Sequence, residues 1–277
     1  MAEQDPSATA RFMDLTDPRY AYMFGFLQAD GHLSEQSRRR GRLTVEISVR
    51  DIHILHEFQR LTPYASSVSE RVRGTNFSSQ HHSATWALCA LEARTTLNEL
   101  GLPYGRKSAT IMPPHLEFSR RDYLRGVIDA DGSVGFTGQG FPFVSLTTAS
   151  TAIGAFLCDY AREITGAERR IKRNARDDIY NIVYTKEAAM HLAEHLYYPG
   201  CLALLRKQTA ADSLTSWQRP AGMRIAPPRR RWSQTDDRIL LRLDDPAAAA
   251  RSLDRTEQSC AMRLWRLRTG RVPMPGA

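Results

Sequence analysis

The chain contains two copies of one motif, MFGFLQADG at Met23–Gly31 and LRGVIDADG at Leu124–Gly132. The copies start 101 residues apart, and each reads apolar-x-Gly-apolar-apolar-x-Ala-Asp-Gly. The apolar residues predict a buried helix, and the Asp-Gly pair predicts a turn at its end. A second copy of the same pattern indicates that the chain contains a duplicated unit.

The segments downstream of the motifs repeat as well. Lys107, in GRKS, follows Asp30 by 77 residues, and Lys207, in LRKQ, follows Asp131 by 76 residues. Landmarks that recur at nearly equal separation are the signature of an internal repeat. We therefore predict two repeats, over residues 18–115 and 116–216, after an N-terminal tail at residues 1–17.

Each repeat has the same expected order of elements, in which a helix ends at the motif and strands follow. The clearest strand is Arg42–Arg50 (RLTVEISVR), where apolar and polar residues alternate. Asp51 and Ser150 stand where the N-caps of the next helices are expected. Further strands are expected at Ser67–Val72, Thr85–Ala90, Val144–Thr148, Arg169–Arg173 and Ile179–Thr185. The order αββαββα, present twice, predicts an α+β fold with pseudo-two-fold symmetry and two antiparallel sheets.

Small residues within the motif predict how the two helices pack. Gly25 and Ala29 lie four positions apart on one helical face, and Gly126 and Ala130 match them. Small residues at this spacing let two helix backbones approach closely. The motif helices are therefore expected to pack against each other with their C-terminal ends together.

The end of each motif helix carries a carboxylate. Asp30 and Asp131 directly precede Gly31 and Gly132, which are expected to take the left-handed conformation that ends many helices. Two carboxylates at helix C-termini, where the helix dipole is negative, are electrostatically unfavourable. A divalent cation relieves this repulsion, and oxygen ligands in an open octahedral site suit Mg²⁺. One such motif alone is explained by a turn, but the duplicated pattern favours a metal site.

These segments resemble the paired LAGLIDADG motifs of single-chain homing endonucleases, with the match covering roughly residues 20–215. The resemblance implies that the motif helices form the interface between two pseudo-symmetric halves. It also implies that the two sheets form a saddle over the major groove of DNA. The implied reaction is hydrolysis of one phosphodiester per strand, which leaves short 3′ overhangs, and the implied biological role is intron mobility.

The resemblance assigns roles to individual residues. It implies that Asp30 and Asp131 bind catalytic metals together with the carbonyls of Ala29 and Ala130. Mg²⁺ is expected, Mn²⁺ as a substitute, and Ca²⁺ to support binding without cleavage. The remaining implied catalytic residues are the paired basic residues Lys107 and Lys207, and Asp51 and Ser150, which fall where a polar residue helps to order the attacking water. One departure is that Gln28 stands where the second motif has Asp129, a position usually outside metal coordination.

The polar face of each sheet is the expected DNA-reading surface, because side chains there reach base edges or phosphates. The alternative is a solvated sheet face, which is the ordinary explanation of an alternating strand. The candidates in the first half are Arg42, Thr44, Glu46, Ser48, Arg50, Arg71 and Arg73. The candidates in the second half are Ser145, Thr147, Arg169, Lys172 and Arg173.

A basic segment follows the repeats. Residues 217–231 are rich in Pro and Arg and predict a linker, and residues 232–270 predict three short helices before a tail at 271–277. Residues 224–277 contain twelve arginines against six acidic residues, whereas residues 1–223 are nearly balanced. A small core is expected from Trp232, Leu240, Leu253, Cys260, Leu264 and Leu267.

The pattern W-S-x-x-D-D, followed by R-T-x-x-S-C-x-x-R-L-x-R-L, resembles a Myb or SANT-like module. The resemblance implies that the third helix is a recognition helix. Contact with the DNA backbone alone, or with a protein, is the alternative. The candidates for DNA contact are Arg255, Gln258, Arg263 and Arg266.

Composition excludes several classes of protein. The four cysteines are scattered and form no zinc-ligand spacing, and no window approaches about 18 consecutive apolar residues. The net charge of +8 favours a polyanionic partner. We expect a monomeric, cytoplasmic, nucleoid-associated protein of bacterial or phage origin that binds a long pseudo-palindromic or asymmetric DNA target. A non-cleaving DNA-binding regulator with a LAGLIDADG-like core and an RNA maturase remain alternatives.

Overall fold

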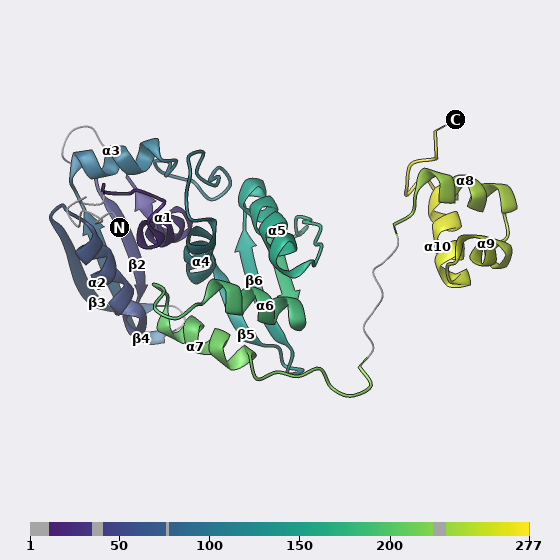
Figure 1. Ribbon diagram of the computed structural model, residues 1–277. Helices are drawn as coiled ribbons and strands as arrows, with labels where there is room; N and C mark the ends of the chain where they lie inside the picture. Colours follow the sequence, from purple (N-terminus) through teal and green to yellow (C-terminus); the bar gives the residue numbers. More distant parts are fainter. Residues whose placement is uncertain (1–10, 35–40, 76–77, 224–230, 277) are drawn as a thin grey trace, which may run out of the picture. The chain divides into compact units, whose positions relative to one another are not determined.

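The computed structural model describes residues 11–34, 41–75, 78–223 and 231–276. The chain forms two compact units, residues 1–219 and residues 220–277 (Figure 1). Residues 11–17, which the sequence assigns to a tail, place Met13 and Leu15 in the core of the first unit. Residues 224–230 of the expected linker lie outside the described residues.

The first half of the larger unit contains a four-stranded antiparallel sheet in the order β1-β2-β4-β3. Helix α2 packs on β3 and β4, so that one face of the sheet is covered (Figure 1). The expected strand Arg42–Arg50 is β2, shortened at both ends. The elements are α1 (Pro18–Asp30), β1 (His32–Leu33), β2 (Leu43–Ser48), the 3₁₀ helix η2 (Val49–Asp51), α2 (Ile52–Leu61), β3 (Ser66–Thr75), β4 (Ser78–Leu88) and α3 (Leu91–Glu99).

The second half repeats this plan with one strand fewer among the described residues, in a sheet of order β5-β6-β7. The expected strand Arg169–Arg173 is wrong, because only a single bridge joins Arg173 to Tyr180. Charged residues at 168–170, 172 and 173 leave too few apolar side chains to bury a strand there. The elements are α4 (Arg120–Asp131), β5 (Gly132–Phe136), β6 (Pro142–Thr148), α5 (Thr151–Thr165), β7 (Tyr180–Thr185), α6 (Glu187–Leu196) and α7 (Leu205–Leu214).

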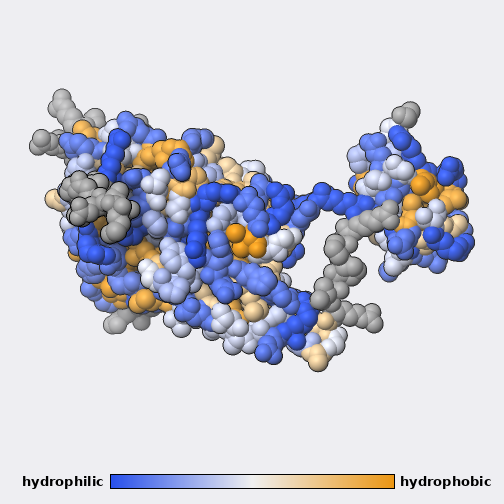
Figure 2. All heavy atoms as spheres, in the orientation of Figure 1, coloured by the Kyte–Doolittle hydropathy of each residue, from blue (hydrophilic) through white to orange (hydrophobic). Residues whose placement is uncertain are grey.

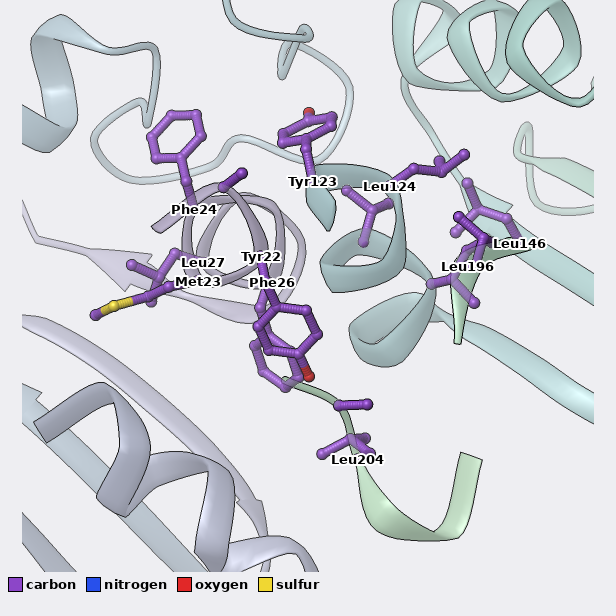
Figure 3. Close-up of a cluster of buried hydrophobic side chains, with 14 of the residues drawn as sticks. Tyr22, Met23, Phe24, Phe26, Leu27, Tyr123, Leu124, Leu146, Leu196 and Leu204 are labelled. Atoms are coloured by element: carbon purple, nitrogen blue, oxygen red, sulfur yellow. The ribbon is translucent and has the colours of Figure 1, made fainter. Parts of the chain in front are cut away.

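The motif helices α1 and α4 lie side by side at the centre of this unit. Figure 3 shows Tyr22 and Phe26 from one helix and Tyr123 and Leu124 from the other within one buried cluster. Every residue of α1 from Tyr20 to Gln28 is buried, so this helix is covered on all sides. Asp17 caps its N-terminus by accepting a hydrogen bond from the Arg19 amide, and Pro18 occupies the first turn.

The smaller unit contains α8 (Gln234–Leu243), α9 (Pro246–Leu253) and α10 (Glu257–Arg268) around their own core. Ser233 and Asp236 form a capping box at the start of α8. The six residues expected to form a small core lie in this cluster, with Trp232 partly buried at its edge. The expected core is therefore confirmed.

The face drawn in Figure 2 is mostly polar. Hydrophilic residues cover most of the described part of the larger unit there, with scattered hydrophobic residues between them. Within the described ranges, no helix combines the length and the apolar character that a membrane crossing requires.

Candidate active site

Two glycines set the distance between the motif helices. A Cβ atom built on Gly25 would lie 2.2 Å from the carbonyl oxygen of Tyr123, and one built on Gly126 would lie 2.1 Å from that of Tyr22. Both contacts are with backbone atoms, which a side-chain adjustment does not relieve. The helices can therefore approach this closely only because both positions are glycine.

The glycines that follow the motifs do not take the expected left-handed conformation. Gly31 has φ −70° and Gly132 has φ −108°, and both are extended. A Cβ on Gly31 would lie 2.6 Å from the Leu27 carbonyl oxygen, and one on Gly132 would lie 2.5 Å from that of Ser145. The prediction of a left-handed cap was wrong. Glycine is needed here for space, because the chain turns directly from helix into strand.

Asp30 and Asp131 are the last residues of α1 and α4, and both side chains reach solvent. The surrounding protein still raises the pKa of each carboxyl, that of Asp30 to about 6. Burial is the larger cause for Asp30, and repulsion from Asp131 adds to it. The two carboxylates are thus within electrostatic reach of each other, with Lys107 and Lys207 opposing the rise.

Each of these lysines is buried beneath a motif-helix end. The Lys107 ammonium donates hydrogen bonds to the carbonyl oxygens of Gln28 and Ala29, at 2.5 and 2.6 Å. Burial lowers the pKa of both lysines to about 8, while nearby aspartates oppose the shift. A cation among these carbonyls offsets the negative end of the helix dipole.

Lys207 makes the equivalent contacts in the second half. Its ammonium donates to the carbonyl oxygens of Ile128, Asp129 and Gly132, at 2.7, 2.6 and 2.8 Å. The two lysines differ in one respect. The Lys107 ammonium donates to the carbonyl oxygen of Ala29, which was expected to bind a metal. A metal ion at this position would therefore share that oxygen with the ammonium.

The structure gives Asp51 and Ser150 different roles. Asp51 is the N-cap residue of α2, as expected, but its side chain makes no capping hydrogen bond. Its buried carboxylate instead accepts a hydrogen bond from Arg206 Nε at 2.9 Å. Ser150 does cap α5, accepting from the Ile153 amide, and it donates to the Ile111 carbonyl at 2.6 Å. Both side chains are buried and hydrogen-bonded within the protein, and Asp51 also lines a cavity beside Asp30; their role in ordering water stays a prediction. Arg206 was missed from the sequence, although its position beside Lys207 marks it.

Two cavities flank the ends of the motif helices. The larger, of about 570 Å³, is lined by residues that include Gly31, His32, Arg106, Lys107 and Ala149. The smaller, of about 230 Å³, is lined by residues that include Asp30, Asp51, Ala130 and Arg206. Residues from both halves of the unit line each cavity. The site is therefore built across the pseudo-two-fold interface.

The outward face of the first sheet brings together the polar residues expected there. Thr44, Glu46 and Ser48 share a face of β2, while Leu43 and Val45 point into the core. Register places Glu46 beside Thr85 and Ser69, and Ser48 beside Ser83 and Arg71. Arg42, Arg50 and Arg73 are exposed nearby. Glu46 accepts hydrogen bonds from Arg73 at 3.1 Å and from Ser83 at 2.7 Å.

The outward face of the second sheet is mostly neutral. Ser145 and Thr147 lie on it, with Thr147 donating a hydrogen bond to Asn181 at 3.0 Å. Asn181 and the exposed Val183, on the neighbouring strand, were not expected from the sequence. The alternation of residues along β7 could have identified both. Tyr180, Ile182 and Tyr184 are buried or point inward, so the residues between them, Asn181 and Val183, point to the outward face.

The three basic candidates of the second half lie outside the strands. Arg169 and Lys172 are exposed in the connection between α5 and β7. Arg173 is held by the protein itself, because it donates to the Ala149 carbonyl at 3.1 Å and lies 4.7 Å from the centre of the Tyr180 ring. Arg173 is therefore partly engaged within the protein, and its contact with DNA stays a prediction.

In the smaller unit, two of the four candidate residues are structural. Arg255 forms an ion pair with Asp236 at 2.8 Å, and Arg263 forms one with Asp237 at 2.6 Å. Both arginines also lie over the Trp232 ring. Arg263 joins α10 to α8, and Arg255 joins the turn before α10 to α8; contact of these two residues with DNA stays a prediction.

The outward side of α10 presents a different set of residues. Gln258 and Arg266 are exposed, as a recognition helix requires. Met262 and Trp265 are exposed beside them, at 46% and 42%. No role was expected for these two apolar side chains, although their spacing from Gln258 places all three on one face of the helix.

The donor set at the motif ends fits a hard divalent cation. Within the described ranges, no group of three or more His, Cys, Asp or Glu side chains could hold a metal ion. A metal here would depend on two carboxylates, on backbone carbonyls and on oxygens from solvent or substrate. Such all-oxygen, incompletely filled sites suit Mg²⁺ better than Zn²⁺. Repulsion between Asp30 and Asp131 also favours a cation beside them.

Comparison with known proteins extends to structure alone, since no family model and no curated protein matches the chain. The homing endonuclease I-WcaI, solved with its DNA recognition sequence, is 13% identical, with a TM-score of 0.50 over 71% of this chain and 87% of that one. Meganuclease I-SmaMI with uncleaveable DNA is 10% identical, with a TM-score of 0.47 over 72% and 87%. The N-terminal LAGLIDADG domain of DUF199/WhiA is 11% identical, with a TM-score of 0.42 over 77% and 88%. With its paired motif helices beside two antiparallel sheets, this chain has the LAGLIDADG homing endonuclease fold.

Proposed function

We propose that this chain is a site-specific endonuclease that hydrolyses one phosphodiester in each strand of duplex DNA, with divalent metal ions as cofactors. The observation that carries the proposal is the arrangement at the ends of α1 and α4. There, Asp30 and Asp131 repel each other, and a buried lysine lies behind each helix end. Perturbed carboxylates and lysines beside cavities are typical of catalytic sites.

Asp30 and Asp131 would hold the metals, with the Ala29 and Ala130 carbonyls as further donors. Mg²⁺ is the proposed physiological ion, with Mn²⁺ as a substitute and Ca²⁺ supporting binding without cleavage. When bound, the ions supply charge neutralisation at the phosphate oxygens that enter and leave the reaction. Lys107 and Lys207 fix the helix ends and add positive charge near the phosphate.

The two outward sheet faces would bind the duplex. The first sheet offers Arg42, Arg50 and Arg71 for phosphates and guanine edges, and the second offers hydroxyl and amide groups. I-WcaI, which shares the fold, was solved with its DNA recognition sequence, and this supports the proposed partner. Because both halves are present in one chain, we propose that a monomer cuts both strands and leaves short 3′ overhangs.

Residues 220–277 would extend the target. The exposed Gln258 and Arg266 of α10 are the proposed contacts, in the manner of a Myb or SANT-like recognition helix. The excess of arginine in this segment would add affinity that falls with salt.

Cleavage of a randomised duplex library in Mg²⁺ tests this function. The wild type should give a defined double-strand cut with short 3′ overhangs. Asp30→Asn and Asp131→Asn should abolish the cut or reduce it to nicking, while binding in Ca²⁺ is retained. Selective binding without any cut in Mg²⁺ or Mn²⁺ would contradict the nuclease proposal.

One observation favours a second candidate, a DNA-binding regulator that does not cleave. Lys107 and Lys207 already place positive charge on the helix-end carbonyls, so the fold does not depend on a metal there. A regulator would select a DNA sequence from the same library and leave it intact. The library experiment therefore separates the two candidates directly.

A further inference from the structure

The two halves carry one matched pair of arginines beside the catalytic lysines. Arg106 precedes Lys107 and Arg206 precedes Lys207, in GRKS and LRKQ. Asp51 of the first half corresponds to Ser150 of the second, each directly before a helix. This correspondence allows the surroundings of the two arginines to be compared.

Arg206 is neutralised within the protein. Its Nε lies 2.9 Å from Asp51 Oδ2, and the Asp51 side chain is only 6% exposed. A buried carboxylate needs such a partner, because an unpaired buried charge is strongly destabilising. Arg206 therefore commits its Nε to Asp51, which Arg50 also approaches at 3.8 Å, and less of its charge is available to a phosphate.

For Arg106, the residue at the position equivalent to Asp51 is not a carboxylate. The matching residue is Ser150, whose hydroxyl is committed to the Ile111 carbonyl and the Ile153 amide. Within the described ranges, no hydrogen bond or ion pair joins the Arg106 side chain to the protein, and the residue is exposed. It lines the larger cavity together with Lys107, Ser108 and Thr110.

We propose that Arg106 is a phosphate-binding residue with no equivalent in the other half, so that the strand seated beside Arg106 is cut first. This inference rests on the proposed endonuclease function. A guanidinium forms short, strong hydrogen bonds to phosphate oxygens, and an arginine without an intramolecular partner loses none of this capacity. Arg206 would have to leave Asp51 before it could do the same.

Strand-resolved cleavage of the target, with each strand carrying its own fluorophore, tests the order of cutting. The wild type should accumulate a nick in one strand before the second is cut. Arg106→Gln should slow that strand at least about tenfold, the effect expected for loss of one charge-assisted contact, and leave the other strand within about twofold. Asp51→Ser reproduces the Ser150 arrangement, releases Arg206, and should speed the slower strand. Equal slowing of both strands by Arg106→Gln, or simple loss of activity in Asp51→Ser, would overturn the proposal.

The salt dependence of DNA binding tests the role of Arg106 independently of cleavage. In Ca²⁺, Arg106→Gln should reduce the slope of log affinity against log salt by about 0.9, the value for one lost phosphate contact. Arg206→Gln combined with Asp51→Asn, which leaves no buried carboxylate unpaired, is the matched control and should leave the slope unchanged. If the slope changes as expected but no DNA is cut, the nuclease proposal fails and Arg106 remains a phosphate-binding residue. An unchanged slope in Arg106→Gln overturns the inference even if the enzyme cleaves.

Discussion

The Tyr22 hydroxyl on one motif helix donates a hydrogen bond to the Asp129 carboxylate on the other, at 2.7 Å and fully buried. The Tyr123 hydroxyl makes the reciprocal bond to the Gln28 amide oxygen at 2.5 Å. Each tyrosine stands three positions before the contact glycine of its helix, Gly25 or Gly126. The sixth position of each motif thus accepts a hydrogen bond from the other half. Both Gln28 and Asp129 can accept such a bond, which explains how they can differ without disturbing the site.

Removing these hydroxyls should destabilise the interface unequally. Asp129 also accepts hydrogen bonds from Tyr197 and the Leu204 amide, which favour its charged form, while burial raises its pKa. Tyr22→Phe removes one donor from a buried carboxylate and should cost about 1–3 kcal/mol of unfolding free energy. Tyr123→Phe removes a donor from a neutral amide and should cost less. Urea denaturation measures both, and a larger effect for Tyr123→Phe would count against this explanation.

Alanine at either contact glycine should separate the motif helices. The added methyl group would lie about 2.2 Å from the opposing backbone oxygen in Gly25→Ala. Overpacking of this kind typically costs about 1–3 kcal/mol. Gly154→Ala on α5 is the matched control, because its nearest neighbour is the movable end of Ile182 at 3.3 Å. Thermal melting should show a clear loss for Gly25→Ala and Gly126→Ala and a small one for Gly154→Ala; equal shifts would argue against the close helix contact.

Periodicity and repetition predicted most of the architecture. The alternation in Arg42–Arg50 identified β2, and the repeated Gly-x-x-x-Ala spacing identified the helices that pack at the centre. Both signals are local, since burial of one face imposes a pattern on neighbouring residues. The expected strand Arg169–Arg173 had basic residues but no alternating apolar ones, and it did not form.

The partners of charged side chains were the part that the sequence did not predict. Asp51 pairs with Arg206, 155 residues later, and no local pattern joins them. Arg255 and Arg263 were predicted to contact DNA, but they pair with Asp236 and Asp237 of α8, which come within reach of them only after folding. The Tyr22 and Tyr123 pair was visible as an extension of the repeat, because both precede their glycines by the same distance.

Arg255, in the turn before α10, and Arg266, within α10, should separate stability from DNA affinity. Arg255 and Asp236 are each only 7% exposed at the side chain, and removing one partner of a buried pair costs about 3–5 kcal/mol. That is comparable to the whole stability of a unit of this size. Arg255→Gln should therefore unfold residues 220–277 and leave the melting of residues 1–219 unchanged. Arg266→Gln, on the exposed side, should preserve both transitions and weaken DNA binding; a stable Arg255→Gln unit would show that this ion pair is dispensable.

Stability in Mg²⁺ should depend on pH through Asp30. The pKa of this carboxyl is raised from 3.8 to about 6 in the folded protein, so the folded state holds its proton more tightly than the unfolded state. Without metal, ionisation of Asp30 therefore removes stability as pH rises from about 4 to about 6. Mg²⁺ binds the ionised carboxylate, so its stabilising effect should be small at about pH 5 and larger at about pH 7.5. Melting temperatures with and without Mg²⁺ at the two pH values measure this difference. Asp30→Asn should reduce both the pH dependence and the response to Mg²⁺, and the double variant with Asp131→Asn should remove them, because the pKa of Asp131 is raised as well. A response that persists in the double variant would place the ion elsewhere.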